Sequence, residues 1–118
     1  LSHAHSRGYL HCDLKPANVR LDAACIHAVV VDWGMACNID HQTEASIARG
    51  TPLYASPEQL TGRNPEQAWG QARLGPPADL WSLGATLFEM VHGTPPFSGE
   101  TFEQLVSNVM QLRFCAAA

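Results

Sequence analysis

Residues 11–18, His-Cys-Asp-Leu-Lys-Pro-Ala-Asn, place an acid, a cation and an amide at fixed offsets in one short segment. The carboxylate of Asp13 could orient an attacking hydroxyl and accept its proton, and the ammonium of Lys15 could neutralise charge on a transferring phosphoryl group. Asn18 could supply a hard oxygen ligand for magnesium. Because Pro16 favours extended backbone at the preceding residue, Asp13 and Lys15 should lie on one face of a loop. The pattern therefore predicts a site for phosphoryl transfer.

The elements that must position this loop precede and follow it directly. Residues 1–10 are typical of a helix end that Gly8 stops before the chain becomes extended. Residues 19–21 and 27–31 are apolar or β-branched runs separated by a turn, so they predict a β-hairpin immediately after the loop. The second run ends in Asp-Trp-Gly at residues 32–34, where an acid at a strand end could hold a divalent cation.

The remaining chain predicts two helices and two irregular segments. Residues 35–49 are polar and without sustained periodicity, which indicates an exposed, mobile segment. Residues 60–77 carry repeated Gly and Pro and predict a loop, with one helical turn at 66–69. Residues 78–92 form the strongest predicted helix, and its apolar residues go nearly all the way round, which indicates burial on every side. Residues 102–114 show helical spacing after a capping Thr.

The segment 11–18 resembles the catalytic loop of eukaryotic-type serine/threonine protein kinases, His-Arg-Asp-Leu-x-x-x-Asn with Lys two residues after the Asp. Cys12 stands where the family usually has Arg. Three further landmarks follow in the family's order. The triplet 32–34 resembles Asp-Phe-Gly, residues 50–58 resemble the end of the activation segment, Gly-Thr-x-x-Tyr-x-Ala-Pro-Glu, and residues 79–84 resemble the Asp-x-Trp-Ser-x-Gly start of the central helix.

This resemblance implies an α+β, protein-kinase-like fold: a mostly helical C-terminal lobe with a short β-hairpin after the catalytic loop. Residues 1–118 would be a partial protein kinase domain that contains the catalytic loop, the activation segment, the central helix and the following helix. The small N-terminal lobe and the last helices of the domain would be absent. The chain does not begin with Met, which suggests a fragment.

By the same resemblance, Asp13 would orient the nucleophile and Lys15 would stabilise the transferred group and contact ATP. Asn18 and Asp32 would take part in cofactor binding as the two protein ligands of Mg²⁺. Trp33, in place of the family's Phe, would be a larger apolar plug under the site.

The resemblance also assigns roles around the substrate. Thr51 would reach toward the catalytic Asp and Lys, which favours Ser or Thr as the acceptor. Tyr54 would belong to the floor for the peptide substrate, and Glu58 would hold the segment in place through an arginine late in the domain. His11 and Asp79 would be structural, with Asp79 bracing the backbone of the catalytic loop.

These roles together imply an ATP-dependent kinase that phosphorylates Ser and Thr hydroxyls of a protein substrate. The alternative is a non-catalytic kinase-like binding or scaffold module, or an inactive truncated product. It rests on Cys12 and Trp33, and on the absence from these residues of the family's Gly-rich loop, strand Lys and partner Glu. Against it, the residues that perform the chemistry in this lobe are retained.

Composition narrows the range of partners. The net charge of −4, with only seven Lys and Arg residues, argues against nucleic acid or an anionic membrane. No apolar run is long enough to span a bilayer, and we find no targeting signal, so a cytoplasmic, intracellular location is expected.

The four cysteines lack paired spacing and indicate reduced thiols. Cys25-x-His27 and Cys37-x-x-x-His41 match no common zinc finger.

Cys12 also bears on regulation. Family kinases with Arg at this position commonly use it to clamp a phosphate on the activation segment, and a neutral thiol cannot make those charge-assisted bonds. Phosphorylation at Thr43 or Ser46 should therefore matter little. A single thiol beside an acid is more often inert than redox-sensitive.

Overall fold

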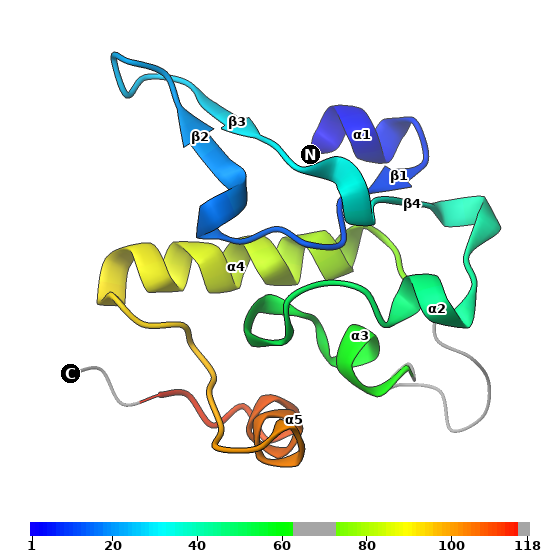
Figure 1. The fold of residues 1–118 in the computed structure, drawn as a ribbon, viewed down its shortest axis with the longest axis vertical. Coiled ribbons are helices and arrows are strands. Elements are labelled where there is room, and N and C mark those ends of the chain that lie inside the picture. Colours follow the sequence, from blue (N-terminus) through cyan, green and yellow to red (C-terminus); the bar gives the residue numbers. More distant parts are fainter. Residues whose placement is uncertain (63–72, 116–118) are drawn as a thin grey trace.

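The long helix α4 (Pro76–His92) runs through the middle of the molecule, with the β2–β3 hairpin on one side and α3 and α5 on the other (Figure 1). The computed structural model describes residues 1–62 and 73–115. The strands in this part are β1 (Tyr9–Leu10), β2 (Val19–Leu21), β3 (Ala28–Val30) and β4 (Cys37–Asn38). The other α-helices are α1 (Ser2–Ser6), α2 (Glu44–Ile47), α3 (Pro57–Thr61) and α5 (Phe102–Met110). Single 3₁₀ turns occupy Pro16–Asn18, Trp33–Met35, Ile39–His41 and Pro52–Tyr54.

The strands form two small antiparallel sheets. β2 pairs with β3, with Val19 opposite Val30, and this hairpin confirms the prediction of a hairpin directly after the loop. The carboxylate of Asp22 accepts a hydrogen bond from the Ile26 amide at 2.8 Å and so closes the turn. The second sheet pairs β1 with β4, with Leu10 opposite Cys37, and this pairing was not predicted from the sequence.

The main core lies where the loop 11–18, the segment after the hairpin and the start of α4 meet. Its buried members come from all three regions: Leu10, Cys12, Cys37, Ile47, Leu74 and Ala78. A second, smaller core under α5 contains Phe97, Leu105 and Val109, against which Leu60 and Trp81 pack. The first core joins segments far apart in sequence, so it holds the loop 11–18 in position.

The prediction that residues 35–49 form an exposed segment is wrong. Cys37, Ser46 and Ile47 are 5 or 6% exposed, and Cys37 and Ile47 belong to the main core. The segment forms β4, a 3₁₀ turn and α2. Two isolated apolar residues among polar ones are enough to anchor it, although they produce no periodic pattern.

Helix α4 lies where the sequence predicts it, beginning two residues earlier with Pro76 and Pro77 in its first turn. Gly93, at a φ of 79°, ends it in a left-handed conformation. The expected burial on every side is wrong, because Leu80, Met90 and Val91 are each more than half exposed. The buried face carries small and polar residues instead, namely Ala78, Asp79, Ser82, Ala85 and Thr86.

The C-terminal helix α5 begins after Thr101, whose side chain accepts from the Gln104 amide at 3.1 Å, and ends at Met110. The predicted helical spacing to residue 114 therefore extends past the helix. Leu112 has a φ of 51°, which breaks the helical path. The predicted helical turn at 66–69 lies outside the described residues.

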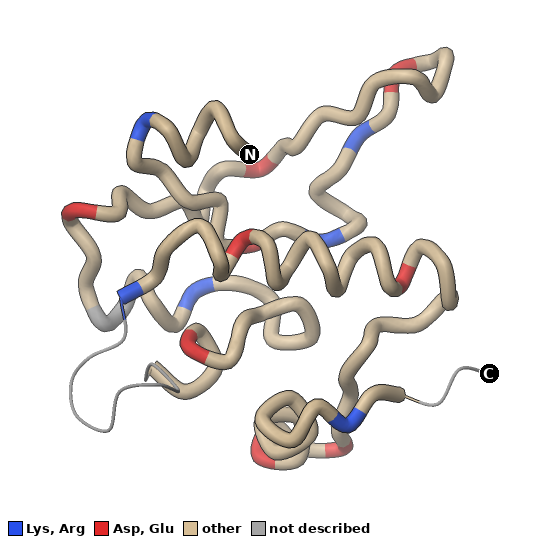
Figure 2. The backbone as a smooth tube through the Cα atoms, turned by 180° about the vertical axis from the view of Figure 1, so that it is seen from behind, with Lys and Arg blue, Asp and Glu red and all other residues tan. Residues whose placement is uncertain are grey.

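The charged residues are dispersed along the described chain (Figure 2). A stripe of Lys and Arg along one element is the usual electrostatic footprint of nucleic-acid binding. Here the Lys and Arg residues occur singly instead. Within residues 1–62 and 73–115, no helix has the length and apolar character needed to cross a bilayer.

Candidate active site

The loop that carries Asp13 leaves β1 and enters a single 3₁₀ turn at Pro16–Asn18, which leads into β2. Lys15 has a φ of −161° and a ψ of 166°, the extended backbone expected of a residue before proline. The ammonium of Lys15 lies 3.3 Å from Oδ2 of Asp13. The acid and the cation thus face the same space.

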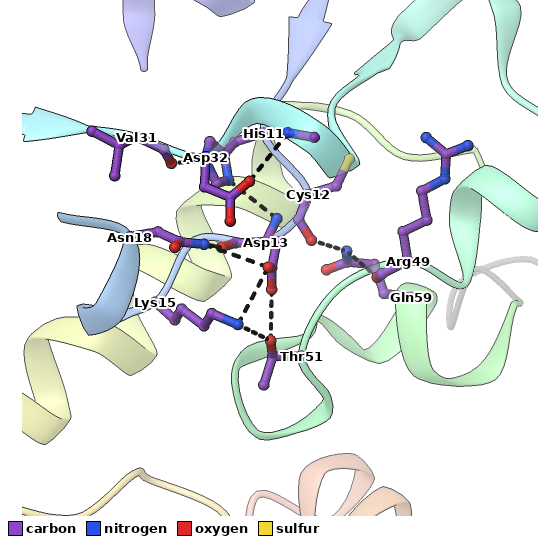
Figure 3. A network of polar contacts seen from close by, with 11 residues as sticks. His11, Cys12, Asp13, Lys15, Asn18, Val31, Asp32, Arg49, Thr51 and Gln59 are labelled. Atoms are coloured by element: carbon purple, nitrogen blue, oxygen red, sulfur yellow. Dashed lines mark hydrogen bonds and ion pairs between the residues drawn. The ribbon is translucent and has the colours of Figure 1, made fainter.

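Thr51 joins these two side chains from the segment that follows α2 (Figure 3). Its hydroxyl donates to Oδ1 of Asp13 at 2.7 Å and accepts from Nζ of Lys15 at 2.6 Å. An aliphatic hydroxyl therefore occupies the position between the acid and the cation. This is the arrangement that an acceptor alcohol needs if Asp13 is to take its proton.

Asn18 is buried, and its amide nitrogen donates to the backbone oxygen of Asp13 at 2.9 Å. Its backbone oxygen accepts from the Val31 amide at 2.9 Å, and Asp32 follows directly. Asp32 has a φ of 59° and lies in the left-handed region, with Oδ1 accepting from Gly34 at 3.4 Å. Within the described residues, Oδ1 of Asn18 and Oδ2 of Asp32 accept no hydrogen bond. Carboxylate and amide oxygens fit Mg²⁺, which prefers hard oxygen ligands.

His11 is fully buried and links the loop to the strand end. Its Nε2 donates to the Val31 oxygen at 2.8 Å, and its Nδ1 accepts from the Asp13 amide at 3.2 Å. Trp33 contacts the imidazole edge-on, with ring centroids 4.7 Å apart. Trp33 was predicted to be an apolar plug under the site; it packs on His11, but it is 39% exposed and its indole nitrogen donates to the Val30 oxygen.

Asp79 lies in the first turn of α4 and is fully buried. Its carboxylate accepts from the backbone amides of His11 and Cys12, both at 2.9 Å. A third partner, Nε2 of His5, lies 2.7 Å away. The long helix thus holds the backbone of the loop 11–18 directly before Asp13.

Gln59 is a positioning residue that was not predicted from the sequence. It is buried, and its amide nitrogen donates to the backbone oxygens of Cys12 at 3.0 Å and Arg49 at 3.1 Å. Ser56 and Gln59 form a reciprocal capping box at the start of α3. The Ser-x-x-Gln spacing in the sequence was the signal that could have identified it. Gly50, which follows Arg49, has a φ of 108°, and a Cβ at this position would lie 2.5 Å from the Cys12 oxygen.

Glu58 and Tyr54 occupy different surroundings. Glu58 is half-buried and forms no ion pair with another described residue. The hydroxyl of Tyr54 donates to Oε2 of Glu89 on α4 at 2.5 Å. Burial, followed by the hydrogen bond and charge of Glu89, raises the pKa of Tyr54 to about 12.

We expect Tyr54→Phe to lower the free energy of unfolding by about 1 kcal/mol, because Glu89 loses a donor. The raised pKa means that the folded protein keeps the Tyr54 proton after the unfolded chain has begun to lose it. The stability from Tyr54 is therefore complete below pH 10 and declines as pH rises from 10.0 to about 12. Denaturation at a series of alkaline pH values should show that the free energy of unfolding declines less for Tyr54→Phe than for the unmodified protein. An equal decline would contradict this assignment.

A model of the protein kinase domain matches residues 1–117 of the chain. The chain belongs to the protein kinase family. This membership and the mixture of helices with two small sheets confirm the family and fold predictions. Among the described residues, no group of three or more His, Cys, Asp and Glu side chains could hold a metal ion; His27 pairs with Asp22 at 2.8 Å, and Cys37 contacts Cys12.

Several curated kinases are similar to this chain. It is 36% identical over 99 residues to the serine/threonine-protein kinase AtPK1/AtPK6 of Arabidopsis thaliana, covering 84% of this chain and 19% of that protein. It is 37% identical over 108 residues to human serine/threonine-protein kinase MRCK beta, covering 90% and 6%. Rat NUAK family SNF1-like kinase 2 is 37% identical over 110 residues, covering 92% and 16%. The chain thus spans less than a fifth of the length of these relatives.

Proposed function

We propose that the full-length product of this gene transfers the γ-phosphoryl group of ATP to Ser and Thr hydroxyls of proteins. In this proposal residues 1–118 form part of the large lobe of the kinase domain. The observation that carries the proposal is the hydroxyl of Thr51 held between Asp13 and Lys15. It supports an aliphatic hydroxyl, rather than a phenol, as the acceptor.

In this mechanism Asp13 orients the substrate hydroxyl and accepts its proton as the oxygen attacks phosphorus. Lys15 stabilises the negative charge on the transferring group. Asn18 and Asp32 would hold Mg²⁺, which would neutralise charge on the ATP phosphates. His11 keeps the Asp13 amide and the residue before Asp32 in register through its two ring nitrogens.

Two residues of the segment after Thr51 are assigned roles around the substrate peptide. We assign Tyr54 to the floor under the substrate peptide, since its hydroxyl is fixed by Glu89 of α4. Glu58 would pair with an arginine that the described residues do not supply. The described chain includes free thiols at all four cysteines, which favours a reducing, cytoplasmic setting.

The direct test is an assay of the purified full-length product with Mg-ATP and a peptide library that contains Ser, Thr and Tyr acceptors. We expect phosphate on Ser and Thr and none on Tyr. Saturable binding of Mg-ATP without transfer to any peptide or protein would instead favour the non-catalytic module. Phosphotyrosine as the main product would contradict the role given to Thr51.

We further expect activity to be independent of phosphorylation at Thr43 and Ser46, because Cys12 offers no charge to a phosphate. Thr43 and Ser46 form a reciprocal pair, with the Ser46 hydroxyl accepting from the Thr43 amide at 2.7 Å. The double Ala variant should therefore lose about 1 kcal/mol of stability as a cap is removed, while kcat stays within about twofold. Phosphatase treatment of the unmodified protein is the matched control. A large loss of kcat after that treatment would contradict the expectation.

A further inference from the structure

We propose that Cys12 and Cys37 form an oxidation site, at which a hydroperoxide closes a reversible disulfide between the catalytic loop and strand β4. The two sulfur atoms lie 3.4 Å apart, and both side chains are buried. The sequence predicted a single thiol beside an acid, but Cys12 is not alone. A second thiol 25 residues later in the chain contacts it directly.

The fold holds both thiols in place. The β1–β4 pairing sets Leu10 opposite Cys37, two residues before Cys12. Cys12 has a φ of 65°, and its amide is bound by Asp79, so its backbone is fixed in an uncommon left-handed conformation. A disulfide bond is ~2.05 Å long, so the sulfurs must approach by about 1.3 Å from their separation of 3.4 Å.

We assign the two thiols different roles in this reaction. The hydrogen bond from the Cys12 thiol lowers the pKa of Cys37, and the positive charge of Arg49 contributes in the same direction. The hydrogen bond to Cys37, followed by burial, raises the pKa of Cys12. Cys37 is thus the thiolate that attacks the oxidant, and Cys12 is the resolving thiol.

The reaction balances with one peroxide. The Cys37 thiolate attacks hydrogen peroxide and, with one proton, becomes a sulfenic acid while water leaves. The sulfur of Cys12 then attacks the sulfenic sulfur, the S–O bond breaks, and the Cys12 proton leaves with the hydroxyl group as a second water. Two thiols are oxidised to one disulfide, and one peroxide is reduced to two waters. A small thiol reductant reverses the reaction by disulfide exchange.

Burial makes this site selective for small oxidants. Cys25 is exposed, at the tip of the hairpin, but it has no second thiol as partner in the described residues. Cys37 belongs to a two-residue strand, which has few ladder hydrogen bonds and can open locally. Peroxide that reaches Cys37 therefore finds the resolving thiol in contact, whereas oxidised Cys25 has none.

The crosslink should displace Asp13, which directly follows Cys12 in the chain. The backbone oxygen of Cys12 accepts from Gln59, and Asp13 follows directly. Drawing the Cys12 sulfur toward β4 strains this connection and shifts Asp13 from Thr51 and Lys15. This consequence rests on the proposed function. Because a displacement of about 1 Å can cost on the order of 100-fold in rate, we expect oxidation to lower transfer by about tenfold or more.

The test treats the full-length product with hydrogen peroxide, blocks free thiols by alkylation, and maps disulfides by mass spectrometry without reduction. Trypsin combined with a protease that cleaves before Asp separates the cysteines, with Cys12 in 8–12, Cys25 in 22–31 and Cys37 in 32–39. We expect a crosslinked pair of 8–12 and 32–39. Phosphoryl transfer measured in parallel should fall on oxidation and recover with dithiothreitol.

Two variants sharpen the test. Cys37→Ser should abolish both the crosslink and the loss of transfer, whereas Cys25→Ser, the matched control, should preserve both. Cys12 and Cys37 recovered only as alkylated thiols or separate oxidised acids would overturn the proposal, as would a crosslink that leaves a measurable transfer activity unchanged. If the crosslink forms and no transfer occurs in either redox state, the oxidation site stands and the proposed function fails.

Discussion

Asp13→Asn in the full-length product should lower kcat by about 10²–10⁴-fold while leaving the folded structure intact. The amide has nearly the shape of the carboxylate and can still accept from Thr51, whose hydroxyl lies 2.7 Å from Oδ1 of Asp13. It cannot take up a proton, and it leaves the ammonium of Lys15, now 3.3 Å from Oδ2, without its counter-charge. The loss should therefore appear in the chemical step.

Single-turnover transfer with saturating Mg-ATP measures this step directly. The KM for ATP should change by less than about threefold, because in this mechanism Asp13 acts on the acceptor hydroxyl and does not bind the nucleotide. Asp22→Asn is the matched control: Asp22 is an acid on the exposed hairpin, bound to His27, and its replacement should leave kcat unchanged. An Asp13→Asn enzyme with undiminished kcat would end the proposed mechanism.

The parts of the site that the sequence could predict are those whose motif residues also constrain the backbone. Pro16 sets the extended conformation that turns Lys15 toward Asp13. Gly50 permits the close approach to the Cys12 oxygen that brings Thr51 to the loop. In both cases local stereochemistry, readable from one residue type, determines which side chains meet.

Other features depend on contacts that one segment does not encode. A two-residue strand such as β4 is too short to show alternation, so its pairing with β1 was not predictable from periodicity. The apolar residues around α4 predicted burial on every side, but the buried face of the helix carries small and polar residues. Leu80 and Met90 remain exposed although their types favour burial. Likewise, the contact of Cys12 with Cys37 follows from that unpredicted pairing.

Asp79→Ala should be the most destabilising single change among the site residues. The carboxylate is fully buried and satisfies the amides of His11 and Cys12 as well as the ring of His5. Removing it leaves the buried amides of His11 and Cys12 without an acceptor, because Ala offers none. Loss of one partner from a buried charged network costs about 3–5 kcal/mol, and we expect a decrease in unfolding free energy of that size.

Amide hydrogen exchange separates this bracing role from a general effect on the fold. The amides of His11 and Cys12 bind Asp79 directly, so they should lose protection more than the amides of α5, which do not contact it. Asp79→Asn keeps one acceptor oxygen but points an amide donor at another donor, so it should cost less, about 1–3 kcal/mol. Asp40→Ala, at an exposed acid, should stay within about 0.5 kcal/mol of the unmodified protein. If Asp79→Ala resembled Asp40→Ala in stability and in exchange at His11 and Cys12, the catalytic loop would be held by Gln59 and the main core rather than by α4.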